Sequence, residues 1–169
     1  NFAPTIVPRG DQQDGTWWLD LPAGEYQISI RTTNASDPFA FSLLDLDTAP
    51  SLPRETPTTA LIDPAQSAVV LHFDAAAGEK LALRMIASTS ENYVGYLLLD
   101  PQGRLVSTQN RVGYLDFTAR LAGTYTLILD GERGASVPAT VNVTIAANPA
   151  LALAPDTVAT VTLPGAGTV

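Results

Sequence analysis

Apolar and polar residues alternate along several short runs of this chain. In residues 26–30 (YQISI), the first, third and fifth side chains are apolar and the two between them are polar. A side-chain period of two is typical of a β-strand that buries one face and exposes the other. The same alternation predicts five further strands, at residues 69–73, 81–85, 94–99, 125–129 and 141–145.

Turn-forming residues separate these runs. Residues 100–103 (DPQG) have Pro at the second and Gly at the fourth position of a β-turn, so they predict a hairpin between residues 96–99 and 105–107. No stretch keeps the 3.6-residue period of a helix, and 13 scattered prolines disfavour long helices. The sequence therefore predicts an all-β fold.

The chain also contains an internal repeat with a period of about 100 residues. Residues 21–28 (LPAGEYQI) recur as residues 120–127 (RLAGTYTL). Further along, residues 37–43 align with residues 137–143, including the proline at the second position of each segment. Two pairs of similar segments at nearly the same spacing indicate a repeated domain.

A further match places the tail of the chain within the repeat. Residues 59–64 (TALIDP) resemble residues 160–164 (TVTLP) when one residue is gapped. The repeat then predicts the second half of a preceding domain in residues 1–48, one complete domain in 49–148, and the opening strand segment of a following domain in 149–169. We expect a mature or excised fragment, because the chain begins at Asn1 without an initiator Met or a signal peptide.

Three motifs in the complete repeat resemble a known family. Residues 70–81 (VLHFDAAAGEKL) are followed by residues 97–103 (LLLDPQG) and residues 121–127 (LAGTYTL). This pattern resembles the bacterial pre-peptidase C-terminal domain and related repeats of very large secreted proteins. The resemblance implies an antiparallel β-sandwich of jelly-roll or Greek-key type, here one complete domain plus a partial second one. It also implies a domain without catalysis of its own, in an auxiliary binding or spacing role.

Charge and composition limit the classes of molecule that the chain can bind. The net charge is −8, which argues against binding to nucleic acid or to anionic membranes, because both attract Lys and Arg. No apolar run approaches the roughly 18 residues of a membrane span. The absence of cysteine excludes disulfides and thiolate metal sites. Only 15% of the residues are charged, so uncharged polar residues carry much of the solvation, which favours an extracellular or cell-surface location.

No catalytic site is predicted. His72 is the only histidine, and it lies in a predicted strand between Leu71 and Phe73. The chain contains no GxSxG nucleophile motif that could use a histidine base. We expect His72 on the outward face of its strand, beside Asp74.

Two carboxylates are candidates for a structural calcium ion. Asp45 and Asp47 form the closest pair, and both side chains would share one face of an extended segment. Together with backbone carbonyls they could bind calcium, or they could be ordinary turn caps. No other cofactor is predicted.

Apolar residues in the two incomplete parts are the predicted assembly sites. Trp17 and Trp18 are adjacent, so in a strand one would join a core and the other would face a neighbour or stack on a sugar ring. Residues 151–163 (LALAPDTVATVTL) are apolar, β-prone and nearly uncharged, and such segments pair with other strands when exposed. The residues expected at interfaces are Trp17, Trp18, Leu151, Leu153, Val158, Val161 and Leu163.

Two functional hypotheses follow. The first is a non-catalytic structural repeat unit of an extracellular filament, stalk or surface layer, whose ends pair with copies of the chain or with neighbouring repeats. The second is an adhesive module that binds a glycan or depends on calcium. The adhesive hypothesis requires an exposed aromatic platform or a cluster of carboxylates, and Tyr93, Tyr96 and Tyr114 are further aromatic candidates for it.

Overall fold

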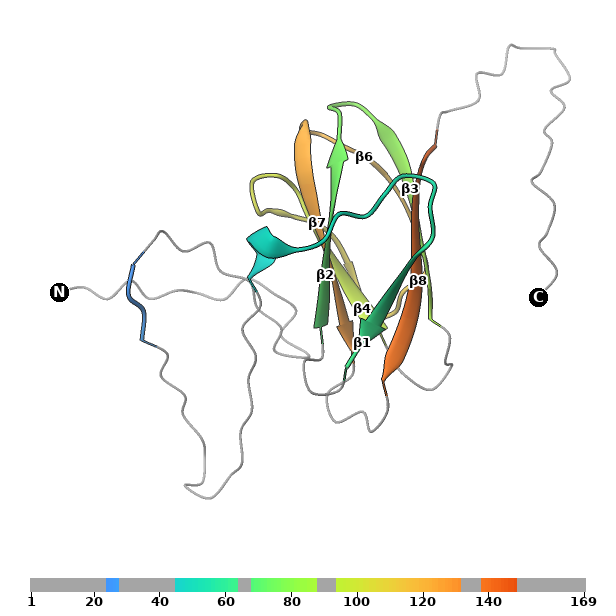
Figure 1. Cartoon of the computed structure of the whole chain (residues 1–169). Helices are drawn as coiled ribbons and strands as arrows, with labels where there is room; N and C mark the ends of the chain where they lie inside the picture. The colour runs from blue at the N-terminus through green and yellow to red at the C-terminus, as the bar shows by residue number, and fades with distance from the viewer. Residues whose placement is uncertain (1–23, 28–44, 64–67, 88–93, 132–137, 149–169) are drawn as a thin grey trace, which may run out of the picture.

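The computed structural model describes residues 24–27, 45–63, 68–87, 94–131 and 138–148. Within these residues, eight strands form two four-stranded antiparallel sheets that pack face to face (Figure 1). A short 3-10 helix, η1 (Leu46–Thr48), precedes the strands. The strands are β1 (Thr58–Ile62), β2 (Ala68–Ala75), β3 (Lys80–Ala87), β4 (Val94–Leu99), β5 (Leu105–Gln109), β6 (Tyr114–Thr118), β7 (Gly123–Gly131) and β8 (Ala139–Ala147).

The order of the strands is that of a jelly roll. One sheet has the order β1-β8-β3-β6 and the other has the order β2-β7-β4-β5. Every connection crosses from one sheet to the other except the β4–β5 hairpin, and eight strands wound in this way form the double-sheet jelly roll. The predicted antiparallel β-sandwich is confirmed.

Most of the predicted strands are present. The five ranges expected from residue 69 onward all lie within β2, β3, β4, β7 and β8, and the predicted hairpin joins β4 to β5. The sequence pattern did not predict β1 or β6, which have only five residues each. Of the strand expected at residues 26–30, Tyr26 and Gln27 are described and have no regular structure, while the remainder lies outside the described residues.

The main core lies between the two sheets. Phe73 stacks on Tyr125 with ring centroids 5.6 Å apart, and Phe117 meets Phe73 edge-on at 6.2 Å. Leu127 and Leu129 are fully buried beside Tyr125 on the same face of β7, as the alternation predicted. These residues anchor the two sheets to each other through aromatic and aliphatic contacts.

A second apolar layer covers the outer face of the sheet that contains β2. Four buried residues, Val70, Leu97, Leu99 and Ile128, point away from the main core, and Leu46 and Ala49 pack against them. The strands β2, β4 and β7 are therefore apolar on both faces. We call residues 45–57 the strap, because they cross this outer face and continue to the other sheet before β1 begins (Figure 1).

The strap is hydrogen-bonded to both sheets. It pairs in parallel with β2 at Ser51 and His72, and in parallel with β8 at Arg54 and Ile145. Leu52, between these two bridges, is only 2% exposed. The strap thus closes one side of the sandwich and is part of the folded domain.

Candidate functional site

The two most distinctive motifs of the sequence lie in contact. Pro101, from the β4–β5 turn, packs against Gly123 at the start of β7. A Cβ atom at position 123 would lie 3.0 Å from Cβ of Pro101, and Gly123 has a φ of 133° that residues with side chains rarely adopt. Both the close approach and the backbone conformation therefore require glycine at this position.

Asp100 organises the β4–β5 turn. Its Oδ1 accepts hydrogen bonds from the backbone N–H groups of Gln102 and Arg104, each at 2.9 Å, and its Oδ2 accepts one from Arg104 Nε at 2.9 Å. Shielding from solvent acts to raise the pKa of Asp100, but the hydrogen bonds and charge of Arg104 and the Gln102 N–H outweigh it, so the pKa is lowered. The carboxylate is held in its charged form and is not poised to act as a general acid.

Tyr125 fixes the turn before β7. Its hydroxyl donates to the carbonyl of Leu121 at 3.1 Å and accepts from the N–H of the same residue at 3.3 Å. The ring itself is 1% exposed. A buried tyrosine that bonds to the backbone a few residues upstream is a known device for fixing corners in β-sandwiches. The LAGTY motif thus serves the fold.

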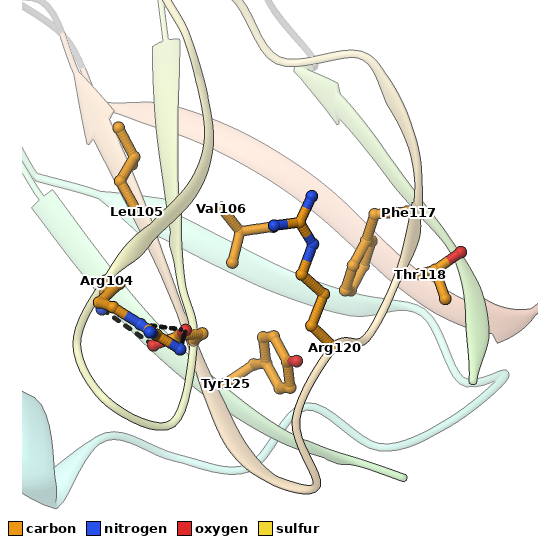
Figure 2. Close-up of a pocket in the computed structure, with 8 residues that line it drawn as sticks. Arg104, Leu105, Val106, Phe117, Thr118, Arg120 and Tyr125 are labelled. Atoms are coloured by element: carbon orange, nitrogen blue, oxygen red, sulfur yellow. Dashed lines mark hydrogen bonds and ion pairs between the residues drawn. The ribbon is translucent and has the colours of Figure 1, made fainter. Parts of the chain in front are cut away.

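An open cleft of about 870 Å³ lies beside these motifs, between the edge strands β5 and β6 (Figure 2). Val106 and Phe117 face each other across it, and the Arg120 side chain extends between them. Arg104 also lines the cleft, but its guanidinium is turned to Asp100, with Nη2 2.9 Å from Oδ2. The full lining is Asp100, Arg104, Leu105, Val106, Phe117, Thr118, Arg120 and Tyr125.

The chemistry of the cleft suits contact rather than catalysis. Its lining combines apolar walls with the exposed guanidinium of Arg120, which makes no ion pair within the described residues. The lining contains one hydroxyl outside the core, that of Thr118, and no histidine or free carboxylate to activate it. Such a lining can hold an apolar group that carries a negative charge.

An exposed tyrosine lies on the other sheet. Tyr114, in β6, is 75% exposed, and Cζ of Arg84 lies 5.5 Å from the centre of its ring. Thr144 is paired with Arg84 on the same sheet, and Asn142 accepts a hydrogen bond from Thr59 at 3.0 Å. This sheet therefore presents an aromatic ring beside a guanidinium, and hydroxyl and amide groups lie on the strands beyond β3.

Of the other aromatic candidates, Tyr96 is not on this surface. Tyr96 is 2% exposed and belongs to the core, with its hydroxyl 3.2 Å from Oγ of Ser107. Tyr93 lies outside the described residues. Alternation alone could not separate Tyr114 from Tyr96, because both occur in strands and only the packing of the sheets decides which side is covered.

His72 lies in the middle of β2 and is half-buried. It is on the opposite face from Leu71 and Phe73, as expected, and its backbone N–H and C=O both bond to the strap. Among the residues that the structure describes, no group of three or more His, Asp and Glu side chains gathers where a metal ion could bind.

The geometry expected for Asp45 and Asp47 is wrong in one respect. The segment is not extended, because η1 begins immediately after Asp45. Oδ1 of Asp45 accepts a hydrogen bond from the N–H of Asp47 at 3.0 Å, and Thr48 Oγ1 donates to the carbonyl of Asp45 at 3.2 Å. Asp45 is therefore a cap of a short helix. Calcium binding at this pair stays a prediction.

The predicted assembly residues are not covered by the structure. Trp17, Trp18, Leu151, Leu153, Val158, Val161 and Leu163 all lie outside the described residues. The cleft, in contrast, was not predicted from the sequence. The sequence did contain one indication of the cleft. Each of the two signature motifs has an arginine next to it, because Arg104 follows the DPQG turn and Arg120 precedes the LAGTY motif.

Comparisons with known proteins give structural neighbours only. No protein-family model and no curated protein matches the chain. The solved structures that are similar to it include the following two. The first is a pre-peptidase C-terminal domain. It belongs to a collagenase from Bacillus anthracis, with 12% sequence identity and a TM-score of 0.48, over 57% of this chain and 93% of that one.

The second neighbour is PliG from Aeromonas hydrophila, a periplasmic inhibitor of g-type lysozyme. It has 13% identity and a TM-score of 0.44, over 57% of this chain and 97% of that one. The family that the sequence motifs resemble is thus represented among the structural neighbours. Separately, none of the described residues forms a helix long and apolar enough to cross a membrane.

Proposed function

We propose that this chain is a non-catalytic structural unit of an extracellular protein, and that it assembles through β-strands supplied by its ends. The observation that carries the proposal is the pairing of β1 with β8. These are the first and last strands among the residues that the structure describes, and they pair antiparallel from Thr58 opposite Val143 to Ile62 opposite Ala139. The domain is completed only when its two ends meet.

Because of the repeat, the chain contains a second sequence similar to β1 and a second sequence similar to β8. Residues 37–43 correspond to 137–143, which contain the first part of β8, and residues 160–163 correspond to 59–62 of β1. Both segments lie outside the described residues, so the proposal rests on their sequences. A β1-like segment in one molecule and a β8-like segment in another have the sequences to form the same antiparallel pair.

The register of this pair follows from that of β1 and β8. In the sandwich, Leu61 is opposite Thr140 and Ala60 is opposite Val141. By correspondence, Thr162 would lie opposite Ala40, and Val161 would lie opposite Phe41. Val161 then takes the place of a buried residue, while Thr162 takes the place of Leu61, which is 61% exposed.

Strand addition of this kind has a clear physical basis. Backbone hydrogen bonds supply affinity, and the alternate side chains that enter the core supply specificity. Because the donated strand and the acceptor are different surfaces, pairing between molecules is head-to-tail and produces a filament unless it closes into a ring. Pairing within a molecule, or with the next repeat of a longer chain, produces a stalk of successive domains.

The test compares the full chain with a chain that ends at Asn148, by negative-stain microscopy and light scattering. Filaments or concentration-dependent oligomers are expected from the full chain and not from the shortened one. Two point variants of the full chain separate pairing from mere stickiness. Val161→Asp should abolish assembly because it places a charge in the core, whereas Thr162→Asp should assemble nearly normally. Monomers from the full chain at all concentrations would contradict the assembly proposal.

The exposed ring of Tyr114 favours glycan adhesion as a second candidate function. A sugar ring can stack on a tyrosine face while neighbouring hydroxyl and amide groups bond to its hydroxyls. The test is titration of the full chain with neutral oligosaccharides, with and without calcium. Tyr114→Ala should abolish binding, while Tyr26→Ala, which removes another exposed tyrosine, should not. Equal binding by all three proteins would exclude this surface as the site.

A further inference from the structure

The strap and β8 are arranged so that tension on the chain acts along both of them. Among the described residues, the strap is the first segment of the sandwich and β8, followed by Asn148, is the last. The strap runs parallel to β8 where Arg54 bridges Ile145, and parallel to β2 where Ser51 bridges His72. Tension draws the strap towards its N-terminal end and β8 towards its C-terminal end. Opposite forces on the strap and β8 therefore shear the bond between Glu55 and Ile145, and the force on the strap also acts along its bonds to β2 at His72.

β1, the strand that follows the strap, has the opposite direction relative to β8. β1 is antiparallel to β8, so its first residue, Thr58, pairs with Val143 in the middle of β8, and its last residue, Ile62, pairs with Ala139 at the start of β8. Tension applied directly to β1 would pull both strands from the same end and break their hydrogen bonds one after another. The strap precedes β1 and therefore shields this weaker geometry from the load.

Arg54 makes the main side-chain contacts of the strap. Its Nη1 lies 3.1 Å from Oε1 of Glu79, and its Nη2 donates to Oε2 of Glu79 at 3.2 Å and to the carbonyl of Asp74. Glu79 is held in turn by the N–H of Ala76 at 2.9 Å. Both side chains of the ion pair are about two-thirds shielded, with exposures of 35% and 29%. Arg54 thus ties the strap to the β2–β3 turn.

Backbone hydrogen bonds add to this anchor. The N–H of Leu52 donates to the carbonyl of His72 at 2.6 Å, and the N–H of His72 donates to the carbonyl of Pro50 at 2.9 Å. The N–H of Glu55 donates to the carbonyl of Ile145 at 2.8 Å. These bonds connect the strap to both sheets, so tension has to break them together before β1 is reached.

From this geometry we infer that the strap is a mechanical clamp, and that the domain has the further function of bearing tension along the chain. Arg54 is its principal residue. The inference deepens the structural role proposed above, because a stalk or filament transmits force through each of its domains. Its test uses single molecules and does not depend on self-assembly, so either proposal can fail without the other.

The experiment is force spectroscopy on the full chain, held by handles at its two ends, at constant force. Unfolding of the sandwich is recognised by its length, because residues 45–148 extend by up to roughly 340 Å. Forced unfolding reports the unfolding rate, and a charged hydrogen bond contributes enough to change such a rate about tenfold. Arg54→Ala should therefore unfold about tenfold faster than the unaltered chain at the same force.

Two controls distinguish a clamp from general stabilisation. Arg104→Ala removes the ion pair with Asp100, which lies in the β4–β5 turn outside the path of the load, and its rate should change less than about threefold. In the second control, the variant Gln102→Cys carries one of the two handles, and attachment there is specific because the chain has no cysteine of its own. Between Gln102 and the C-terminal end, the strap carries no load and Arg54→Ala should have little effect.

The outcomes are distinct. A large effect of Arg54→Ala that appears only when both chain ends are held supports the clamp. If Arg54→Ala and Arg104→Ala accelerate unfolding equally, or if Arg54→Ala has the same effect in both pulling directions, the strap is not a clamp. Chemical unfolding of both variants, measured without force, verifies that each one folds.

Discussion

Gly123 is the residue on which the two signature motifs depend. It combines a φ of 133° with a close approach to Pro101. A side chain would meet both a strained backbone and a rigid proline ring, and neither can relax easily. The glycine of the LAGTY motif is therefore explained by packing, and it need not touch any ligand.

Replacing Gly123 tests this explanation. Gly123→Ala should lower the free energy of unfolding by about 1–3 kcal/mol, because a non-glycine residue at this φ is strained. Gly113→Ala is the matched control, since a Cβ atom there has open space and no positive φ was found. Urea unfolding, monitored by far-UV circular dichroism, measures the free energy of unfolding of both variants. Equal stability of the two variants would contradict the role assigned to Gly123.

The lowered pKa of Asp100 predicts how the stability of the folded chain depends on pH. Its pKa in the folded chain is lowered from the ordinary value of 3.8, so the unfolded state binds the proton more readily. The contribution of Asp100 to stability is complete above about pH 5 and is lost as the pH falls through the folded-state pKa. Asp100→Asn should remove this part of the acid sensitivity, as measured by urea unfolding between about pH 2 and pH 7. Unchanged acid sensitivity in Asp100→Asn would show that Asp100 does not contribute to it.

Among the structural elements, the strap differs most from what local sequence indicates. It contains no regular strand, yet it covers the outer apolar layer and bonds to both sheets. Its buried residue, Leu52, lies next to Pro53 in a segment without alternation. Periodicity could not identify Leu52 as a core residue, because the pattern of a single segment carries no information about the sheets that it crosses.

The burial of Leu52 gives a prediction for this element. Leu52→Ala should lower the free energy of unfolding by about 2–5 kcal/mol, because it leaves a cavity in a closely packed region. Leu61→Ala, in β1, removes the same atoms from a side chain that is 61% exposed, so it should change stability by less than about 0.5 kcal/mol. Chemical unfolding measures the difference. Similar losses in the two variants would argue against a packed strap.

At the scale of the whole molecule, the internal repeat and the pairing of β1 with β8 together suggest how copies connect. A strand register is strict wherever one face is buried, because a shift by one residue turns every side chain to the other face. The proposed assembly therefore predicts specific residue pairs between molecules, which the absence of cysteine makes simple to test.

Cysteine cross-linking tests that register. The double variant Ala40→Cys with Thr162→Cys should form intermolecular disulfides under mild oxidation, because the two side chains would lie opposite each other. Ala40→Cys with Val161→Cys should cross-link poorly, since its two side chains would point to opposite faces. Non-reducing electrophoresis measures both, and equal cross-linking would mean that the segments meet without the predicted register.

The sequence by itself determined most of the described strands and the β4–β5 turn. Period-two alternation identified five of the eight strands in the described residues, and the DPQG turn identified the hairpin, because both signals come from residues close together in the chain. The repeat and the family resemblance extended this to a β-sandwich. The short strands β1 and β6 were not identified, since five residues give too little alternation and β6 exposes its tyrosine.

Only the tertiary structure decided which of these parts meet. The contact of Pro101 with Gly123, the cleft between β5 and β6, and the bonds from the strap to His72 and Ile145 all join residues far apart in the sequence. Arg54, the residue on which the proposed clamp depends, has no local pattern that marks it. Its importance arises from the winding of the jelly roll, which places the strap beside the last strand and parallel to it.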